Sequence, residues 1–188
     1  MNELSNPEVK RVLEAASRKG VALDVRVFER STHTAEDAAA AVDVDLSRIV
    51  KSLVFVAPRY DGKLVPIICL VSGRNQVDLA LLAAVTGEVV VRPATAREIR
   101  DLTGFASDGV PPIGHARTLR VLMDQDLSQY EWIWASAGAD FALFRVAPST
   151  LRMLANAVVV PLDNGSWIPS AGAQRIEPRL QFEAGSGA

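Results

Sequence analysis

The sequence contains few of the side chains that most often carry catalysis or hold a small fold together. Its 188 residues include one cysteine and two histidines, and aromatic residues make up 6%. A single cysteine excludes an internal disulfide and a zinc site built on paired cysteines. Cys69 lies in an apolar run without a basic neighbour, so we interpret it as a small buried side chain. Mechanisms that use several histidines are disfavoured, and we expect no metal and no cofactor.

Neither sign of charge dominates, and long apolar runs are missing. Lysine and arginine number 20 against 22 aspartates and glutamates, a formal net charge of −2. This balance gives no global attraction to polyanions, so nucleic-acid binding would need a local basic patch. The first residues lack the cations and apolar block of a signal peptide, and no run is long enough to span a membrane. We therefore expect a cytoplasmic protein with no membrane partner.

Several common catalytic motifs are also missing. No glycine-rich phosphate loop precedes Lys51, no Gly-x-Gly-x-x-Gly follows a strand pattern, and no Gly-x-Ser-x-Gly elbow occurs. His33 and Glu36 could share a helix end and bind a metal ion, but no third ligand is in view. A histidine in a helix-capping region is the favoured interpretation of His33.

What is present is an uninterrupted alternation of helical and strand patterns in a chain that is 49% apolar. Capping residues and apolar periodicity predict helices at 7–19, 34–42, 77–85, 95–103 and 148–154. Period-two patterns predict strands at 22–28, 53–57, 64–71, 88–91, 119–123, 131–137, 141–146 and 157–161. The alternation predicts one α/β (α+β) domain over residues 1–169, with a mixed, largely antiparallel sheet covered by helices. Residues 170–188 are expected to form a flexible tail.

Three features could form a functional site. Lys51 immediately precedes a predicted strand and is either a solvated cation, favoured by the residues alone, or a donor to a phosphate or carbonyl oxygen. The loop Asp108–His115 holds two prolines and two glycines, and is either a stiff turn or a rigid frame whose carbonyls bind a water or an ammonium group. The run Trp134–Gly138 is either a tight hairpin or the wall of a small pocket.

The order of these motifs resembles the YbaK family, the prolyl-tRNA-synthetase-associated editing domain. The resemblance covers about residues 20 to 162, and no single segment of it is diagnostic. The ordered set is specific and consists of Thr34–Ala39, Ile49–Phe55, Ser72-Gly73 with Val77-Asp78, Gly104–His115, Ser136–Gly138, and Pro148 with Leu151.

The resemblance implies a compact domain with a barrel-like mixed sheet that hydrolyses the ester of a wrongly charged aminoacyl-tRNA in trans. The family's lysine corresponds to Lys51 and its Gly-x-x-x-Pro loop to Asp108–Pro112. The first glycine of that loop is replaced here by Asp108, a change that could alter substrate choice or the placement of water. Ser52 stands where a threonine is common.

The resemblance also implies the roles of individual residues. Lys51 would contact the ester carbonyl or the terminal phosphate, and the loop carbonyls would orient water or the terminal ribose. Small residues at 136–138 would limit the amino-acid side chain, and His115 would support the loop rather than act as a base. The implied catalytic residues are Lys51, Gly109 and Pro112, and the implied substrate-binding residues are Ser52, Asp108, Pro111, Gly114, His115, Ser136, Ala137 and Gly138.

The expected substrate is the acceptor end of a tRNA mischarged with alanine, serine or cysteine, with tRNA-Pro and an aminoacyl-tRNA synthetase as candidate partners. Two alternatives stay open. One is a non-catalytic module of the same fold that binds an amino acid or charged tRNA, and the other is an unrelated esterase with Ser136 as nucleophile. Candidate cations for the tRNA body are Lys10, Arg11, Arg18, Arg74, Arg97, Arg100, Arg117 and Arg120.

Overall fold

The structure is a computed structural model that describes residues 6–29 and 32–163. The tail expected at 170–188 lies outside the described residues. The helices are α1 (Pro7–Ser17), α2 (Ala35–Val42), α3 (Leu79–Thr86), α4 (Ala96–Thr103) and α5 (Pro148–Ala155), with short 3₁₀ helices at Leu46–Arg48 and Gln125–Gln129. The strands are β1 (Asp24–Val27), β2 (Val50–Pro58), β3 (Leu64–Ser72), β4 (Arg92–Pro93), β5 (Arg120–Asp124), β6 (Ile133–Ser136), β7 (Ala142–Val146) and β8 (Val158–Val160).

Three of the predicted helix starts, those of α1, α2 and α4, are confirmed by side chains that satisfy the first free amides. The Asn6 side chain accepts hydrogen bonds from the backbone amides of Glu8 and Val9 at the start of α1. Thr34 with Asp37, and Thr95 with Glu98, form reciprocal capping boxes that begin α2 and α4. The α2 capping box fixes the start of this helix at Ala35.

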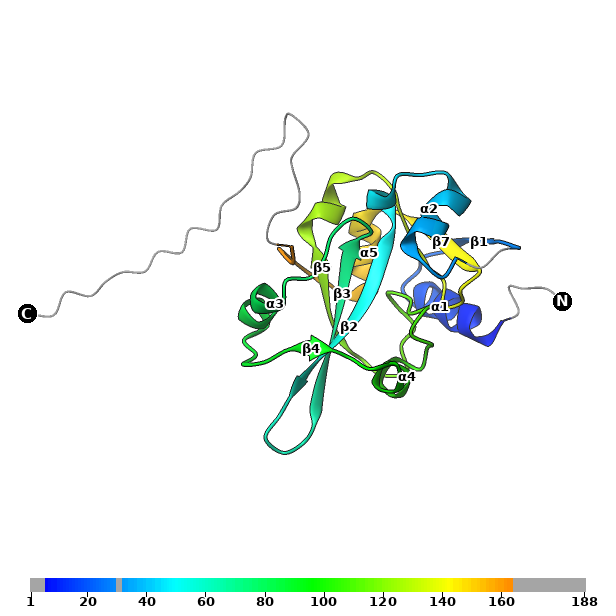
Figure 1. The fold of residues 1–188 in the computed structure, drawn as a ribbon. Coiled ribbons are helices and arrows are strands. Elements are labelled where there is room, and N and C mark those ends of the chain that lie inside the picture. The colour runs from blue at the N-terminus through cyan, green and yellow to red at the C-terminus, as the bar shows by residue number, and fades with distance from the viewer. Residues whose placement is uncertain (1–5, 30–31, 164–188) are drawn as a thin grey trace, which may run out of the picture.

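The strands form two sheets that meet along one edge. One sheet has the order β4-β2-β3-β5-β8, in which β3–β5 and β5–β8 are parallel pairs, and the other has the antiparallel order β1-β7-β6. A parallel bridge between Ile49 and Trp134 connects the start of β2 with β6. The prediction of a barrel-like, mixed, largely antiparallel arrangement covered by helices is confirmed. The tip of the β2–β3 hairpin projects away from this body (Figure 1).

Two strands differ from their predicted bounds by more than two residues. The strand expected at 88–91 is wrong, because the residues that pair with β2 are Arg92 and Pro93, while Val89 and Val90 are exposed. The second strand begins earlier than expected, because its ladder continues to the pair formed by Val50 and Ser72. Lys51 therefore lies within β2 rather than before it, and its backbone is fixed on the β3 side.

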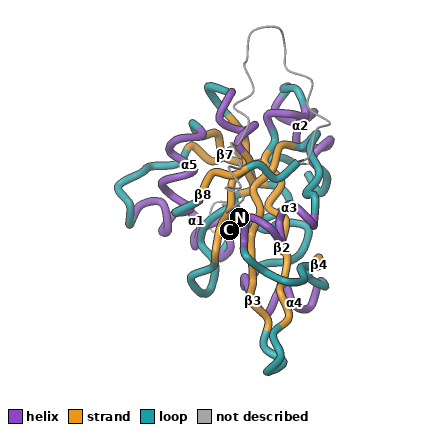
Figure 2. The backbone as a smooth tube through the Cα atoms, turned by 90° about the vertical axis from the view of Figure 1, so that its left-hand side faces the viewer, coloured by secondary structure: helices purple, strands orange, loops and turns teal. Residues whose placement is uncertain are grey.

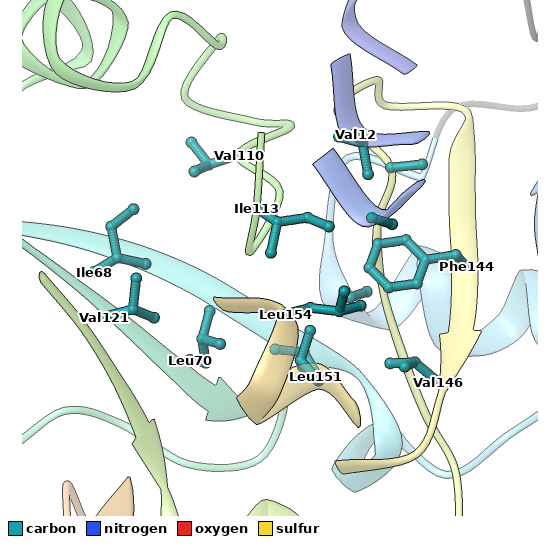
Figure 3. Packing of buried hydrophobic residues seen from close by; sticks show 14 of the residues in the cluster. Val12, Ile68, Leu70, Val110, Ile113, Val121, Phe144, Val146, Leu151 and Leu154 are labelled. Carbon is teal, nitrogen blue, oxygen red and sulfur yellow. The ribbon is translucent and has the colours of Figure 1, made fainter. Parts of the chain in front are cut away.

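Helices cover both faces of the five-stranded sheet. Helices α1 and α5 lie on one face and α3 on the other (Figure 2). The main core contains Ile68 and Leu70 of β3, Leu151 of α5, and also Val110 and Ile113 from the long loop before β5 (Figure 3). Because two side chains of this loop are buried in the core, the loop is held against the sheet.

Two further expectations concern burial and membranes. Cys69 is fully buried in the smaller core beside α3, as expected, and burial raises the pKa of its thiol to about 12. Over residues 6–29 and 32–163, none of the helices has the length and apolar character needed to cross a bilayer.

Candidate active site

A cavity of about 220 Å³ opens where the start of β2, the start of α2 and the loop at 107–110 come together. Its wall includes five of the site residues that the family resemblance implies. Their side chains or backbone come from β2, from the loop and from the end of β6, three segments far apart in the chain. These five residues are Lys51, Ser52, Asp108, Gly109 and Ser136.

Lys51 is partly buried, and its ammonium group is already oriented. Its Nζ donates a hydrogen bond of 2.6 Å to the backbone carbonyl of Asn75. Burial lowers the pKa of Lys51 from its usual value, while the nearby carboxylates of Glu36 and Asp163 act in the opposite direction. An ammonium group has three donors, so the contact with Asn75 leaves two for a ligand.

A buried polar cluster holds Asn75, and sequence reasoning missed it. The Asn75 side-chain amide donates to Oδ2 of Asp124 at 2.9 Å and to Oδ2 of Asp126 at 2.8 Å. Asp124 is almost fully buried, and desolvation raises the pKa of its carboxyl to about 6. These carboxylates are 49 and 51 residues from Asn75, and no local spacing in the sequence indicates the contact.

The hydroxyl of Ser136 connects the loop to the end of β6. It donates to the carbonyl of Gly109 at 3.1 Å and accepts from the backbone amide of Gly138 at 3.0 Å. A serine nucleophile needs a neighbouring base that takes its proton. Because the Ser136 proton is directed to a backbone carbonyl, this geometry favours a structural role over a nucleophilic one.

Ser52 contributes a buried hydroxyl to the cavity region. Among the residues that the structure describes, its Oγ has no hydrogen-bond partner. It shares a face of β2 with Val50 and Val54, both members of the main core. A buried hydroxyl without a partner costs about 1–3 kcal/mol, so a ligand that pairs with it recovers this energy.

His33 lies at the rim of the cavity, next to the residue that caps α2. Its Nδ1 is 3.5 Å from Oδ2 of Asp108, and its Nε2 is 3.5 Å from Oδ2 of Asp140. The sequence placed His33 in a capping region but did not indicate these partners. Within the described ranges, no group of three or more histidine, cysteine or acidic residues could hold a metal ion.

The other residues singled out in the sequence lie elsewhere. Pro112, Gly114 and His115 line a second cavity of about 270 Å³. His115 contacts the carbonyl of Pro111 through Nε2 at 2.8 Å, and burial lowers the pKa of its imidazole. Ala137 is buried, and Gly138 turns the chain with φ at +98°. Neither of these two residues, nor Pro111, is among the described residues that line the first cavity.

Several of the basic side chains singled out above have partners within the chain. Arg11 donates to the carbonyl of Gly104 at 2.6 Å and stacks over the Phe105 ring at 3.9 Å. Arg74 pairs with Asp45, and Arg97 lies 3.8 Å from a carboxylate oxygen of Asp101. Arg117 and Arg120 donate to the carbonyls of Asp101 and Thr86. These contacts engage part of each guanidinium, and a role of these cations in binding tRNA stays a prediction.

A comparison with protein families identifies the chain. The family described as "Aminoacyl-tRNA editing domain" matches residues 29–154. The chain belongs to this family. The match includes the cavity, the whole loop at 107–115 and the end of β6, so all parts of the candidate site lie within the editing domain.

Relatives of this editing domain carry names related to tRNA charging. A protein of Enterococcus faecalis named "Putative Cys-tRNA(Pro)/Cys-tRNA(Cys) deacylase EbsC" is 28% identical over 65% of this chain and 73% of its own length. A proline--tRNA ligase of Stenotrophomonas maltophilia is 28% identical over 66% of this chain and 22% of the ligase.

A solved structure has the same fold at higher identity. It is described as "a putative trans-editing enzyme for prolyl tRNA synthetase", with 42% identity and a TM-score of 0.77. The alignment covers 85% of this chain and 99% of the other. The likeness therefore extends over nearly the whole of that protein.

Proposed function

We propose that this editing domain is a trans-acting aminoacyl-tRNA deacylase of the cytoplasm, which hydrolyses the ester of a tRNA mischarged with alanine, serine or cysteine. The activity resides in the single domain expected at residues 1–169. The observation that carries the proposal is the cavity in which Lys51 and the loop at 107–110 meet, in a chain that belongs to the editing family. The names of the relatives support tRNA-Pro as the tRNA and prolyl-tRNA synthetase as an associated enzyme.

The chemistry needs no side-chain nucleophile. A water molecule adds to the carbonyl carbon of the activated ester, and negative charge develops on the carbonyl oxygen. The Lys51 ammonium stabilises this oxyanion, because a cation in a partly buried site interacts with it more strongly than water does. The intermediate then releases the ribose oxygen, which takes up the proton that the attacking water gives up, and the neighbouring ribose hydroxyl can relay this proton.

The loop and Ser136 have a positioning role in this mechanism. Val110 and Ile113 are buried in the core, and the Gly109 carbonyl accepts the Ser136 hydrogen bond. The loop backbone is therefore rigid, and its remaining acceptor positions orient water or the terminal ribose. Pro112 and His115 support the loop from the side of the second cavity.

The walls of the cavity favour a small amino acid. Besides the polar groups, they include Ala35 and Ala38 of α2 and Leu143 of β7. Such walls reject a large side chain by steric overlap, but they separate small ones poorly, because one methylene is worth only about 1–3 kcal/mol. The proposal therefore extends to alanine, serine and cysteine esters as a group.

The test is a panel of tRNA-Pro molecules charged with alanine, serine, cysteine or proline. We expect loss of one or more of the small esters, with the prolyl ester hydrolysed at least about tenfold more slowly. Binding of charged tRNA without loss of any ester would instead identify a non-catalytic module. A Ser136→Ala variant that abolishes turnover, with Lys51→Ala fully active, would favour a serine esterase.

A further inference from the structure

Among the described residues that line the cavity, one is acidic and one is a lysine. They are Asp108 and Lys51. We infer that Asp108 binds the α-ammonium group of the aminoacyl ester, so that the site recognises esters whose amino group is free. This inference rests on the proposed function and assigns a role to the residue at which the chain departs from its family's loop pattern.

The two charges correspond to the two polar groups of the substrate. In an aminoacyl ester, the carbon that bears the α-ammonium is bonded directly to the ester carbonyl carbon. When a cation of the site stabilises the carbonyl oxygen, the positively charged α-ammonium of the substrate therefore lies close to that cation. A carboxylate in the same cavity pairs with that group and offsets its repulsion from Lys51.

The contacts of Asp108 leave it able to accept this group. Its side chain is 52% exposed at the rim, and its Oδ2 lies 3.5 Å from Nδ1 of His33. A carboxylate offers about four acceptor positions, and the 3.5 Å contact with His33 occupies at most one of them. His33 also lies 3.5 Å from Asp140, so the imidazole bridges the loop to the segment before β7 and limits the movement of Asp108.

The inference separates two classes of ester. An N-acylated ester, in which the nitrogen is an amide, carries no charge at this position and gains nothing from Asp108. The gain in binding affinity for a free amine is modest, because water screens the charge of a carboxylate that is half exposed. We expect a preference of about three- to tenfold for the free amine.

The matched control is Asp140. It contacts the same imidazole at the same distance as Asp108, but it is not among the described residues that line the cavity. Asp140→Asn removes the same charge as Asp108→Asn, and both variants keep the shape of the side chain. An effect that came only from the charge around His33 would therefore appear in both variants.

The experiment measures binding of two unreactive probes, 3′-alanylamino-3′-deoxyadenosine and its N-acetyl derivative, by calorimetry. We expect the wild type and Asp140→Asn to bind the free amine about three- to tenfold more tightly than the acetylated probe, and Asp108→Asn to bind both equally. Three results would overturn the inference: a preference that survives in Asp108→Asn, an equal loss of affinity for both probes, or a wild type that binds neither.

Turnover is measured separately, so the two proposals fail in different ways. A preference for the free amine that depends on Asp108, without loss of alanyl, seryl or cysteinyl esters from tRNA, would support the ammonium site and refute the deacylase. Hydrolysis of alanyl-tRNA and N-acetyl-alanyl-tRNA at equal rates by the wild type would support the deacylase and refute the ammonium site.

Discussion

The Nζ of Lys51 donates its hydrogen bond to the backbone carbonyl of Asn75, a residue of the turn that follows β3. Lys51 pairs with Val71 in the β2–β3 ladder, so the lysine and the turn are held by the same hairpin. The turn is fixed in addition by the Asn75 side chain, which donates to Asp124 and Asp126. The orientation of Lys51 therefore depends on the polar cluster that holds Asn75 in place.

Removal of the Asn75 side chain is expected to affect the lysine without touching the substrate. In Asn75→Ala the carboxylates of Asp124 and Asp126 lose their shared donor, and the turn that orients Lys51 loosens. We expect kcat to fall about tenfold with a smaller change in KM, measured by deacylation of alanyl-tRNA. Gln76→Ala, an exposed neighbour on the same turn, is the control and should keep full activity.

The stability of Asn75→Ala must be measured beside its rate. Loss of the buried hydrogen bonds is expected to lower the free energy of unfolding by about 1–3 kcal/mol. If the fall in kcat were explained by the fraction of unfolded protein alone, the positioning role of Asn75 would be refuted.

Asp124 is expected to make stability depend on pH in a specific direction. Its carboxyl has a pKa of about 6 in the folded protein, above the usual 3.8. Between these two pH values the folded state therefore holds a proton that the unfolded state has released. The stability that this proton contributes is present below about pH 4 and is lost as the pH rises to about 6. The shift corresponds to about 3 kcal/mol as an order of magnitude.

Asp124→Asn removes this titration while keeping the shape of the side chain. The variant's free energy of unfolding, relative to that of the wild type, should therefore rise between pH 4 and pH 7 in urea titrations. A difference between the two proteins that stays constant over this range, or falls, would contradict the raised pKa.

Two glycines near the cavity are expected to respond differently to alanine. A Cβ on Gly138 would lie 2.8 Å from Cε1 of Phe105 and 3.0 Å from the carbonyl of Glu8, at a φ of +98°. A Cβ on Gly109 would meet its nearest atom, the carbonyl of Gly138, at 3.5 Å. We expect Gly138→Ala to cost about 2–4 kcal/mol in chemical denaturation and Gly109→Ala less than about 1 kcal/mol. Equal losses would show that the loop is packed more tightly than the structure indicates.

The thiol of Cys69 should be unreactive in the folded protein. It is fully buried, and its pKa of about 12 leaves almost no thiolate near neutral pH. Labelling with a thiol-specific disulfide reagent should occur at the rate of unfolding and become fast in denaturant. Rapid labelling of the native protein would place Cys69 in an accessible environment.

Local signals in the sequence predicted much of the fold. Asn6, Thr34 and Thr95 begin helices because their side chains satisfy backbone amides within three residues, and such short-range bonds are visible in sequence. The Asp61-Gly62 turn between β2 and β3 is likewise visible in the sequence, and Gly62 adopts the positive φ, +77°, that hairpin turns favour. The parallel pairing of β3 with β5 and of β5 with β8 had no local signal, because the partners are far apart in the chain.

The site was predicted only in part, because contacts between segments that are distant in the chain leave no local signal in the sequence. The order of motifs indicated Lys51 and the loop, and the structure brings Lys51 and Asp108 to one cavity. The loop was treated as a single element, yet its end at His115 faces a second cavity, because Val110 and Ile113 anchor it in the core between the two. The contact of His33 with Asp108 depends on how α2 packs against the loop, which no spacing in the sequence encodes.

Stabilisation of the reacting ester by Lys51 is measured by single-turnover hydrolysis of alanyl-tRNA-Pro. Lys51→Ala is compared with the wild type, while binding of the amide-linked alanyl adenosine probe is measured on both proteins. We predict that the rate falls at least about 100-fold while affinity for the probe changes much less. A folded Lys51→Ala variant whose rate stays within about twofold of the wild type would contradict the account.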